Sequence, residues 1–408
     1  MNMSWSLLID FGVIGIALFC ATFIRMVFPF LQKFRVPNSL TAGFFLLFFY
    51  NYGAPLFGMN TFNLESMVFH LLGISFAAMS LRKTDGETLK REVFPVTMVL
   101  LTQHIVQAII GLVLTWILIS TIFPDLFPGF GLLFPLGFAL GPGQALAFGH
   151  KWSSAGFTGA ESVGVTFAAL GFFFACFGGI ALINIGIKNK WLRPEPEKSV
   201  NPRYDETGMV TEEKHQGVGM KLVSLSEAID TLSLNLAIVF GVYLIAFLTL
   251  KTLGYLLHFA GTTGDQFAST LWAITYVFAG LVAMVIKKFL RLSRLDHLTD
   301  NGALTRISGF SVDFLVAGSL GVISITVVKH YWAPILMITV TGMIAIVFLM
   351  LWMSSRMFKQ YSFYRMITIY GAMTGTLATG LALLRVVDSE FKTPVASDHM
   401  YAAGLMFP

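Results

Sequence analysis

Residues 131–150 read GLLFPLGFALGPGQALAFGH, an apolar stretch that is interrupted near its middle by Gly141-Pro142-Gly143. A helix that crosses a lipid bilayer needs about 20 mostly apolar residues, so the stretch is long enough to span one. Glycine and proline are poor residues for the centre of a straight helix and good ones for a turn. The stretch is therefore either a broken span or a hairpin, and the charges around it decide between the two.

The composition of the whole chain places this stretch in a membrane protein. Of the 408 residues, 56% are hydrophobic and only 12% are charged, with a mean hydropathy of +0.75. Soluble chains carry about 25% charged residues, so this chain lacks the charges to cover itself in water. We expect an all-α polytopic membrane protein. Its continuous spans are expected at 6–31, 38–58, 64–81, 93–122, 157–187, 228–256, 267–287, 308–328 and 333–355.

The Lys and Arg residues give the orientation. Basic residues follow the first and third expected spans but not the second and fourth, and the polar segment 188–226 is rich in them. Because cytoplasmic loops carry an excess of Lys and Arg, this pattern puts the N-terminus outside a cell (inner) membrane and 188–226 in the cytoplasm as a linker. The net charge of +5 follows from this topology, and no basic surface with interleaved aromatics indicates nucleic-acid binding.

This orientation makes 131–150 a re-entrant hairpin. If it crossed the bilayer, the next helix would put the basic linker outside, against the charge rule. The stretch 364–387 is expected to be a second hairpin, because basic residues stand on both sides of it and Gly371, Gly375 and Gly380 interrupt it. The two hairpins then enter the membrane from opposite sides.

The order of elements predicts two halves with inverted topology. An N-terminal repeat, 1–187, contains the outer hairpin, and a C-terminal repeat, 227–408, contains the inner one. Such repeats are typical of secondary transporters, whose solute sites lie near the midplane where interrupted helices meet. The helix after the second hairpin has few residues left, so we expect it to be truncated in this chain. No GxSxG, HExxH, Walker or GxGxxG motif indicates an enzyme or a bound cofactor.

The outer hairpin offers Gly141, Gly143 and Gln144 as candidate ligands for a solute. Backbone groups at such a break are free to bind, and the Gln144 amide can hydrogen-bond a neutral or charged group. The alternative is a packing kink whose small residues allow close helix contact.

The inner hairpin offers Thr374, Gly375, Thr376 and Thr379. Their hydroxyl oxygens suit Na⁺ or a substrate amine, although threonines in helices also bond back to their own carbonyls. Arg385 follows, and it either clamps a substrate carboxylate, snorkels to the cytoplasm or pairs with a neighbouring acid.

Among the continuous spans, Asp313 is the sharpest candidate, as an Na⁺ ligand. It lies about one turn inside the expected helix 308–328, and a carboxylate within a span costs roughly 3 kcal/mol, so such residues are usually functional. Gln103 and Gln107 share one face of the fourth span, where they serve transport or join helices. His70 is expected to be an interhelical contact, and Glu161 a solvated residue near a helix end.

The chain resembles the glutamate:sodium symporter family. The stretches that carry the likeness are 36–43, Phe157-Thr158-Gly159-Ala160 through Gly178-Gly179, and the inner hairpin through Arg385. The likeness extends over most of the chain, in order. The run Gly141-Pro142-Gly143-Gln144 lacks the histidine that bacterial glutamate carriers have in their outer hairpin.

The resemblance implies a homodimer in which a mobile part carrying both hairpins moves like an elevator against a scaffold. It implies Na⁺-driven uptake of glutamate or a similar small anionic or zwitterionic solute, with Gln103 matching a family glutamine among the Na⁺ ligands. The alternatives are an H⁺- or Na⁺-coupled carrier of another organic anion, with Asp313 as the protonation site, and a membrane sensor that does not transport.

Overall fold

A computed structural model describes residues 5–33, 36–83, 92–191, 220, 222–223, 227–388 and 393–406. Within these residues every regular element is a helix. The elements are α1 (Ser6–Val27), α2 (Pro29–Lys33), α3 (Asn38–Phe48), η1 (Phe49–Gly53), η2 (Ala54–Phe57), α4 (Phe62–Leu81), α5 (Val93–Thr121), η3 (Phe130–Leu132), α6 (Leu133–Phe138), α7 (Pro142–Ser153), α8 (Ala160–Lys188), α10 (Thr231–His258), α11 (Gly261–Ala273), α12 (Thr275–Leu292), η5 (Asp296–Leu298), α13 (Asn301–Val322), α14 (Ile325–Met357), α15 (Ser362–Met373), α16 (Leu377–Val387) and α17 (Val395–Met406).

Eight helical segments of the described chain are long and apolar enough to cross a membrane, which agrees with a multi-pass membrane protein. The prediction of one continuous span over 267–287 is wrong. The structure divides this region at Ile274 into α11 and α12, where Ile274 leaves the helical backbone region at φ −104° and ψ 28°. The Thr275 hydroxyl donates to the carbonyl oxygen of Trp272 at 2.6 Å, so a side chain satisfies a carbonyl at the break.

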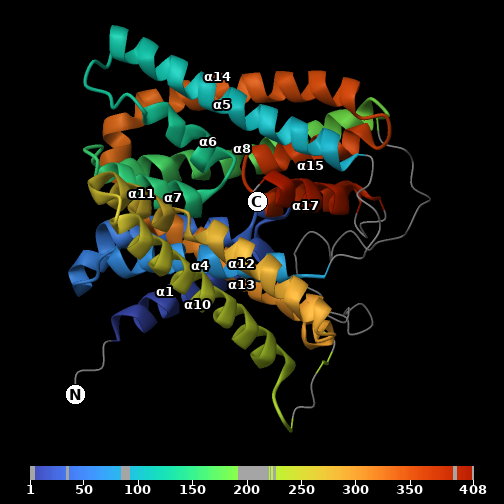
Figure 1. Ribbon diagram of the computed structural model, residues 1–408. Coiled ribbons are helices and arrows are strands. Elements are labelled where there is room, and N and C mark those ends of the chain that lie inside the picture. Colours follow the sequence, from blue (N-terminus) through green and yellow to red (C-terminus); the bar gives the residue numbers. More distant parts are fainter. Residues whose placement is uncertain are drawn as a thin grey trace.

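The helices form two groups that lie one above the other in Figure 1. We call the first the scaffold group; it contains α1, α3, α4 and α10 to α13, which pack around α4 and α13. The second, the hairpin group, contains α5 to α8 and α14 to α17. Each has its own buried apolar core, and the two meet where α7 and α8 lie against α4 and α13.

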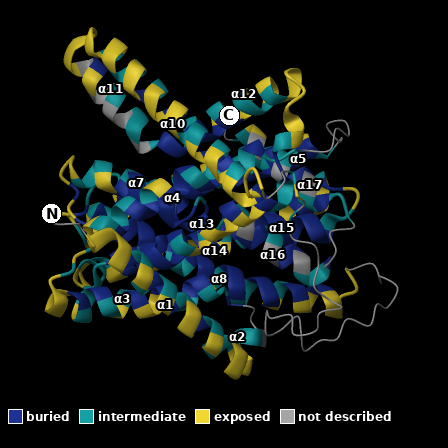
Figure 2. Ribbon diagram, turned by 90° about the horizontal axis from the view of Figure 1, so that it is seen from below, coloured by how far each residue is buried: buried dark blue, intermediate teal, exposed yellow. Residues whose placement is uncertain are grey.

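The exposed apolar side chains lie on the outer helices. Figure 2 shows long exposed faces on α10 and α11, whereas α7 and α15 are mostly buried. Exposed residues on the outer faces include Phe19 on α1, Trp116 on α5 and Phe348 on α14. Contiguous apolar surface of this extent suits contact with lipid rather than water.

The two interrupted segments are helical hairpins. The first runs from α6 through a break at Ala139–Gly141 into α7, and the second from α15 through a break at Thr374–Thr376 into α16. In each hairpin the two arms pack against each other, most extensively in the second. The first hairpin ends at Ser153 rather than near residue 150, and the second begins at Ser362.

Within each group, the helices of the N-terminal and C-terminal halves of the chain pack on each other reciprocally. Helix α3, from the N-terminal half, packs on α13, and α12, from the C-terminal half, packs on α4. In the hairpin group, α5 packs on α17 and α14 packs on α8 in the same crossed manner.

The predicted boundary between 308–328 and 333–355 is wrong. The chain leaves the helix at Ile323–Ser324 instead, and α14 runs without interruption through Lys329, His330 and Pro334. The amide of Asn51 supplies partners for the backbone freed by this break: it donates to the Ile323 carbonyl oxygen at 2.8 Å and accepts from the Ile325 nitrogen at 3.0 Å. This joint is also where the chain passes from the scaffold group to the hairpin group.

Most of the expected linker, 188–226, falls outside the described residues. The described end of α8 is Lys188, and α10 begins at Thr231 after the N-cap Asp230, whose carboxylate accepts from the Leu232 and Ser233 nitrogens. The last helix is described over Val395–Met406. The expectation that it is truncated stays a prediction.

Candidate functional site

The tips of the two hairpins touch. Gly141, at the break of the first hairpin, has φ 93° and ψ 174°, which is a backbone conformation that residues with a side chain rarely adopt. A Cβ atom at Gly141 would lie 2.7 Å from Cγ2 of Thr376, at the break of the second hairpin. Glycine at this position therefore allows both the turn and the contact between the tips.

Helix α8 crosses both tips. A Cβ atom at Gly171, near the middle of α8, would lie 2.5 Å from the carbonyl oxygen of Thr374 and 2.9 Å from that of Phe138. The missing side chain lets the ends of both first arms approach the same turn of α8. Two helix C-terminal carbonyls are thereby brought close together inside the protein.

A cavity of about 210 Å³ lies beside the second tip, on the boundary between the two groups. It is smaller than the roughly 300–1,000 Å³ pockets that hold drug-sized ligands, so it suits a small solute. Its walls come from the start of α3, the middle of α8 and α13, and α16. The lining residues are Pro37, Ser39, Leu40, Phe172, Ala175, Cys176, Val312, Asp313, Val316, Thr376, Thr379, Leu383 and Val386.

Three of the predicted Na⁺ ligands, Asp313, Thr376 and Thr379, line this cavity together. Ser39, from the start of α3, lines the cavity together with Asp313. The Thr376 and Thr379 hydroxyl oxygens are 3.2 Å apart. The described lining thus has one carboxylate and three hydroxyl groups, all of them oxygens that a hard cation prefers.

Asp313 lies farther from the start of its helix than the sequence indicated. Because α13 begins at Asn301 rather than near 308, Asp313 is about 18 Å along the helix, at 1.5 Å per residue. The earlier start is set by Asp300, whose carboxylate caps the helix by accepting from the Ala303 nitrogen at 2.7 Å. A carboxylate at this depth is a stronger functional candidate than one near a helix end.

The starts of two helices also face the cavity. Pro37 is the N-cap of α3, and Thr376 is the N-cap of α16, where its hydroxyl oxygen accepts from the Thr379 nitrogen at 3.4 Å. Backbone N–H groups and the positive end of the helix dipole favour negative charge at such ends. The cavity therefore combines groups that attract a cation with groups that attract an anion.

Among the described residues, the basic side chain of Arg25 borders the cavity without lining it. Arg25, near the end of α1, donates from Nη1 to the Val36 carbonyl oxygen at 3.1 Å, directly before the lining residue Pro37. It is also close enough for its charge to act on the Cys176 thiol. Sequence reasoning missed Arg25, Ser39 and Cys176, because nothing local distinguishes them from residues that pack helices.

The three candidate glutamines, Gln103, Gln107 and Gln144, lie outside the cavity lining. Gln103 and Gln107 are fully buried on α5, and Gln107 donates to the Met373 carbonyl oxygen at 3.1 Å, at the end of α15. Gln103 does not line the cavity, and within the described residues its amide has no hydrogen-bond partner. The Gln144 amide oxygen is likewise buried without a partner in the described chain. An unpaired buried polar group costs about 1–3 kcal/mol, so both glutamines are suited to bind something further.

Two of the candidate ligands, Thr374 and Gly143, have structural roles in helix bonding and helix packing. The Thr374 hydroxyl donates to the Tyr370 carbonyl oxygen of its own helix at 2.8 Å. A Cβ atom at Gly143 would lie 3.0 Å from Leu72 of α4, so this glycine lets α7 approach the scaffold group. Gly375 lies at the second tip, within the turn that Thr376 closes. Arg385 belongs to α16, but its side chain is outside the described part of the structure.

His70 and Glu161 are both held by side-chain hydrogen bonds. His70 Nδ1 is 2.9 Å from the Tyr243 hydroxyl group, an interhelical contact between α4 and α10. Glu161 accepts a short hydrogen bond from the Ser153 hydroxyl, which joins α8 to the end of α7.

Comparison of the chain with models of protein families, with curated proteins and with solved structures finds no significant match. The assignment of function therefore depends on the geometry described above and on the residues of the chain.

Proposed function

We propose that this protein is a secondary active symporter that couples Na⁺ influx to the uptake of a small carboxylate or amino acid such as glutamate. The observation that carries the proposal is the cavity, which lies between the scaffold group and the hairpin group and beside the broken helix α16. A solute bound there would be carried along if one group moved against the other. Transporters place their sites in this way, at discontinuous helices between repeats.

The reciprocal packing supports an inverted repeat. If α3 corresponds to α12 and α4 to α13, the contacts α3 with α13 and α12 with α4 are equivalent. The crossed contacts α5 with α17 and α14 with α8 fit the same correspondence. An inverted repeat would let the protein adopt two related states, open to opposite sides, as alternating access requires. We propose an elevator movement of the hairpin group on this basis.

The proposed ligand roles follow from the chemistry of the cavity. Asp313, Thr376 and Thr379 would bind Na⁺, and the starts of α3 and α16 would face the carboxylate of the solute. Na⁺ bound beside Asp313 would offset the carboxylate charge, so that solute affinity rises with Na⁺ and Na⁺ affinity rises equally with solute. Arg385, on the same helix as Thr376 and Thr379, is proposed as a further ligand for the carboxylate of the solute.

The proposed setting is a cell inner membrane, with the N-terminus outside and lipid around the exposed faces of α1, α5 and α10. In that orientation the start of α3 and the later turns of α16 would lie toward the cytoplasm. A homodimer through the scaffold group is proposed from the resemblance to glutamate:sodium symporters.

Purified protein in proteoliposomes tests the function. We expect uptake of radiolabelled glutamate, or of another carboxylate in a small panel, to require an inward Na⁺ gradient. Uptake that is indifferent to the Na⁺ gradient would contradict the proposal. Alkylation of Cys176 gives a second measurement, because a solute bound in the cavity should protect this lining thiol in an Na⁺-dependent way.

Proton coupling is the second candidate, and Asp313 is the observation that favours it, because a lone carboxylate in a cavity can carry a proton. Asp313→Asn distinguishes the two. It should abolish Na⁺ dependence if Asp313 binds Na⁺, and pH dependence if Asp313 carries the proton. If no carboxylate raises the melting temperature in the presence of Na⁺, a membrane sensor that does not transport becomes the better proposal.

A further inference from the structure

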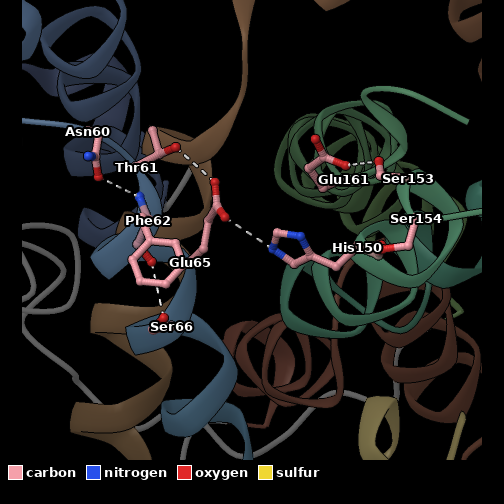
Figure 3. Close-up of polar contacts among 9 residues, drawn as sticks. All are labelled: Asn60, Thr61, Phe62, Glu65, Ser66, His150, Ser153, Ser154 and Glu161. Atoms are coloured by element: carbon pink, nitrogen blue, oxygen red, sulfur yellow. Dashed lines mark hydrogen bonds and ion pairs between the residues drawn. The ribbon is translucent and has the colours of Figure 1, made fainter. Parts of the chain in front are cut away.

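An ion pair between His150 and Glu65 joins the two helix groups near the C-terminal end of α7. His150 lies in the last turn of α7, and its Nε2 atom is 3.3 Å from Oε2 of Glu65 in the first turn of α4 (Figure 3). Helix α7 belongs to the hairpin group and α4 to the scaffold group. Any sliding of one group along the other must therefore separate these two side chains.

Both partners lie at helix ends, Glu65 in the first turn of α4 and His150 in the last turn of α7. The other carboxylate oxygen of Glu65 accepts from the Thr61 hydroxyl at 2.8 Å, which fixes the orientation of the carboxylate. A negative charge in a first helical turn and a positive charge in a last turn each interact favourably with the helix dipole. The side chain of Glu65 is 20% exposed and that of His150 is 46% exposed, so protons can reach the pair from the water.

The charges around His150 favour its protonation. It lies outside the eight candidate spans. The hydrogen bond to Glu65 raises the pKa of His150 above its usual value, burial lowers the pKa in part, and the charges of Glu65 and Glu161 raise it further. Lys151 is its neighbour on α7, and α6 has no titratable side chain.

Helices α13 and α11, which also pack on α7, carry titratable residues as well. Helix α13 carries Arg306 and Asp313, and Asp313 lines the cavity. Helix α11 carries Asp265, which is 2.9 Å from His258.

A second side-chain contact near His150, between Ser153 and Glu161, does not cross the interface between the two groups. Glu161 on α8 accepts from Ser153 on α7, and both helices belong to the hairpin group (Figure 3). Movement between the groups leaves this contact intact. Glu161 is therefore a matched control for Glu65, since it is a carboxylate near the same histidine but not a bridge.

We propose that His150 and Glu65 form a proton-dependent latch that holds the hairpin group in the described position against the scaffold group. This inference rests on the relative movement of the groups in the proposed function. Because His150 binds its proton more tightly when paired than when separated, protonation favours the latched arrangement. The added stability is fully present below the pKa of the separated histidine and is lost as pH rises through the raised pKa of the paired one.

Spin labels can measure the latch without any solute. Labels on Asn60 and Ala155, which are exposed on either side of the pair, report the separation of α4 and α7 in full-length protein in liposomes. The native Cys20 and Cys176 are replaced by serine. Exposed ion pairs have modest energies, so we expect the ratio of the short to the long distance to rise about two- to fivefold from pH 8 to pH 5.

Three variants separate the latch from general effects of pH. Glu65→Gln and His150→Gln should each remove the pH response, whereas Glu161→Gln should keep most of it. A distance distribution that does not change with pH in the otherwise native protein, or a response that survives in His150→Gln, would overturn the proposal. If the distances respond to pH but no carboxylate is taken up, the proposed substrate is wrong and the latch stands.

Discussion

Both hairpins consist of two helical arms on either side of a break, but they contact different parts of the molecule. The second arm of the first hairpin, α7, lies along the scaffold group, where Gly143 approaches Leu72 and Leu315 and where His150 meets Glu65. The second hairpin is fastened inside its own group.

Two contacts fasten the second hairpin. The Tyr370 hydroxyl donates to the Phe174 carbonyl oxygen of α8 at 2.8 Å, and Arg365 pairs with Asp398 of α17 at 2.5 Å. Its second arm, α16, lines the cavity with Thr376 and Thr379. The first hairpin thus supplies contacts between groups, and the second supplies the site and its rigid support. Three sets of variants test this division.

The largest effect should come from the support of the second hairpin. Arg365 and Asp398 are 2% and 1% exposed, and Asp398→Asn would leave a buried guanidinium without its counter-ion. Loss of one partner of a buried pair costs about 3–5 kcal/mol. We expect a correspondingly large drop in the unfolding free energy, measured by denaturant titration in detergent micelles.

Arg356→Met is the control for this change. Arg356 is exposed and lies over the Trp352 ring at 4.7 Å, a contact that contributes about 0.5–1 kcal/mol at an exposed site. Equal losses in Asp398→Asn and Arg356→Met would show that the second hairpin is not anchored by this pair.

The contact between the tips should have the next largest effect. Gly141→Ala combines an unfavourable backbone conformation, which costs about 1–3 kcal/mol, with a clash against the Thr376 methyl group. Adding Thr376→Ser removes that methyl group, so we expect the double variant to recover part of the lost stability and uptake. Gly12→Ala serves as the control because a Cβ atom there meets nothing within 4 Å. No recovery in the double variant would mean that the tips do not press on each other.

The smallest effect should distinguish two threonines of the second tip. Thr376 lines the cavity, whereas the Thr374 hydroxyl is bonded to its own helix. We expect Thr376→Val to raise the Na⁺ concentration for half-maximal uptake about tenfold, equivalent to about 1.4 kcal/mol. Thr374→Val should change it by no more than about twofold, since the hydroxyl is not offered to a ligand. Equal effects on Na⁺ dependence would remove Thr376 from the proposed site.

Much of the architecture could be predicted from local composition. The apolar runs marked most of the long helices, and two of the glycines that were expected to interrupt the hairpins, Gly141 and Gly375, lie at the two tips. Boundaries were less predictable. The expected spans 308–328 and 333–355 left a gap that contains Lys329 and His330, but α14 runs through both residues.

The candidate site was only partly predictable. Asp313, Thr376 and Thr379 were found because a carboxylate or a cluster of hydroxyls is unusual in an apolar segment. Ser39 and Arg25 join them through the packing of α1 and α3, which no local pattern records. Gln103 has the same chemical character as the site residues, yet packing puts it elsewhere.

The sequence alone determined that the chain is built of apolar helices and where two of its segments must break, since hydropathy and the backbone preferences of glycine and proline act locally. Only the tertiary structure decided where the chain passes between groups, which oxygens share a cavity and which charges meet across the interface. Asn51 satisfies the backbone at Ile323, 272 residues away, and Glu65 meets His150 from another helix group. Such pairings depend on the packing of whole helices, because a buried polar group takes whichever partner the fold brings within hydrogen-bonding distance.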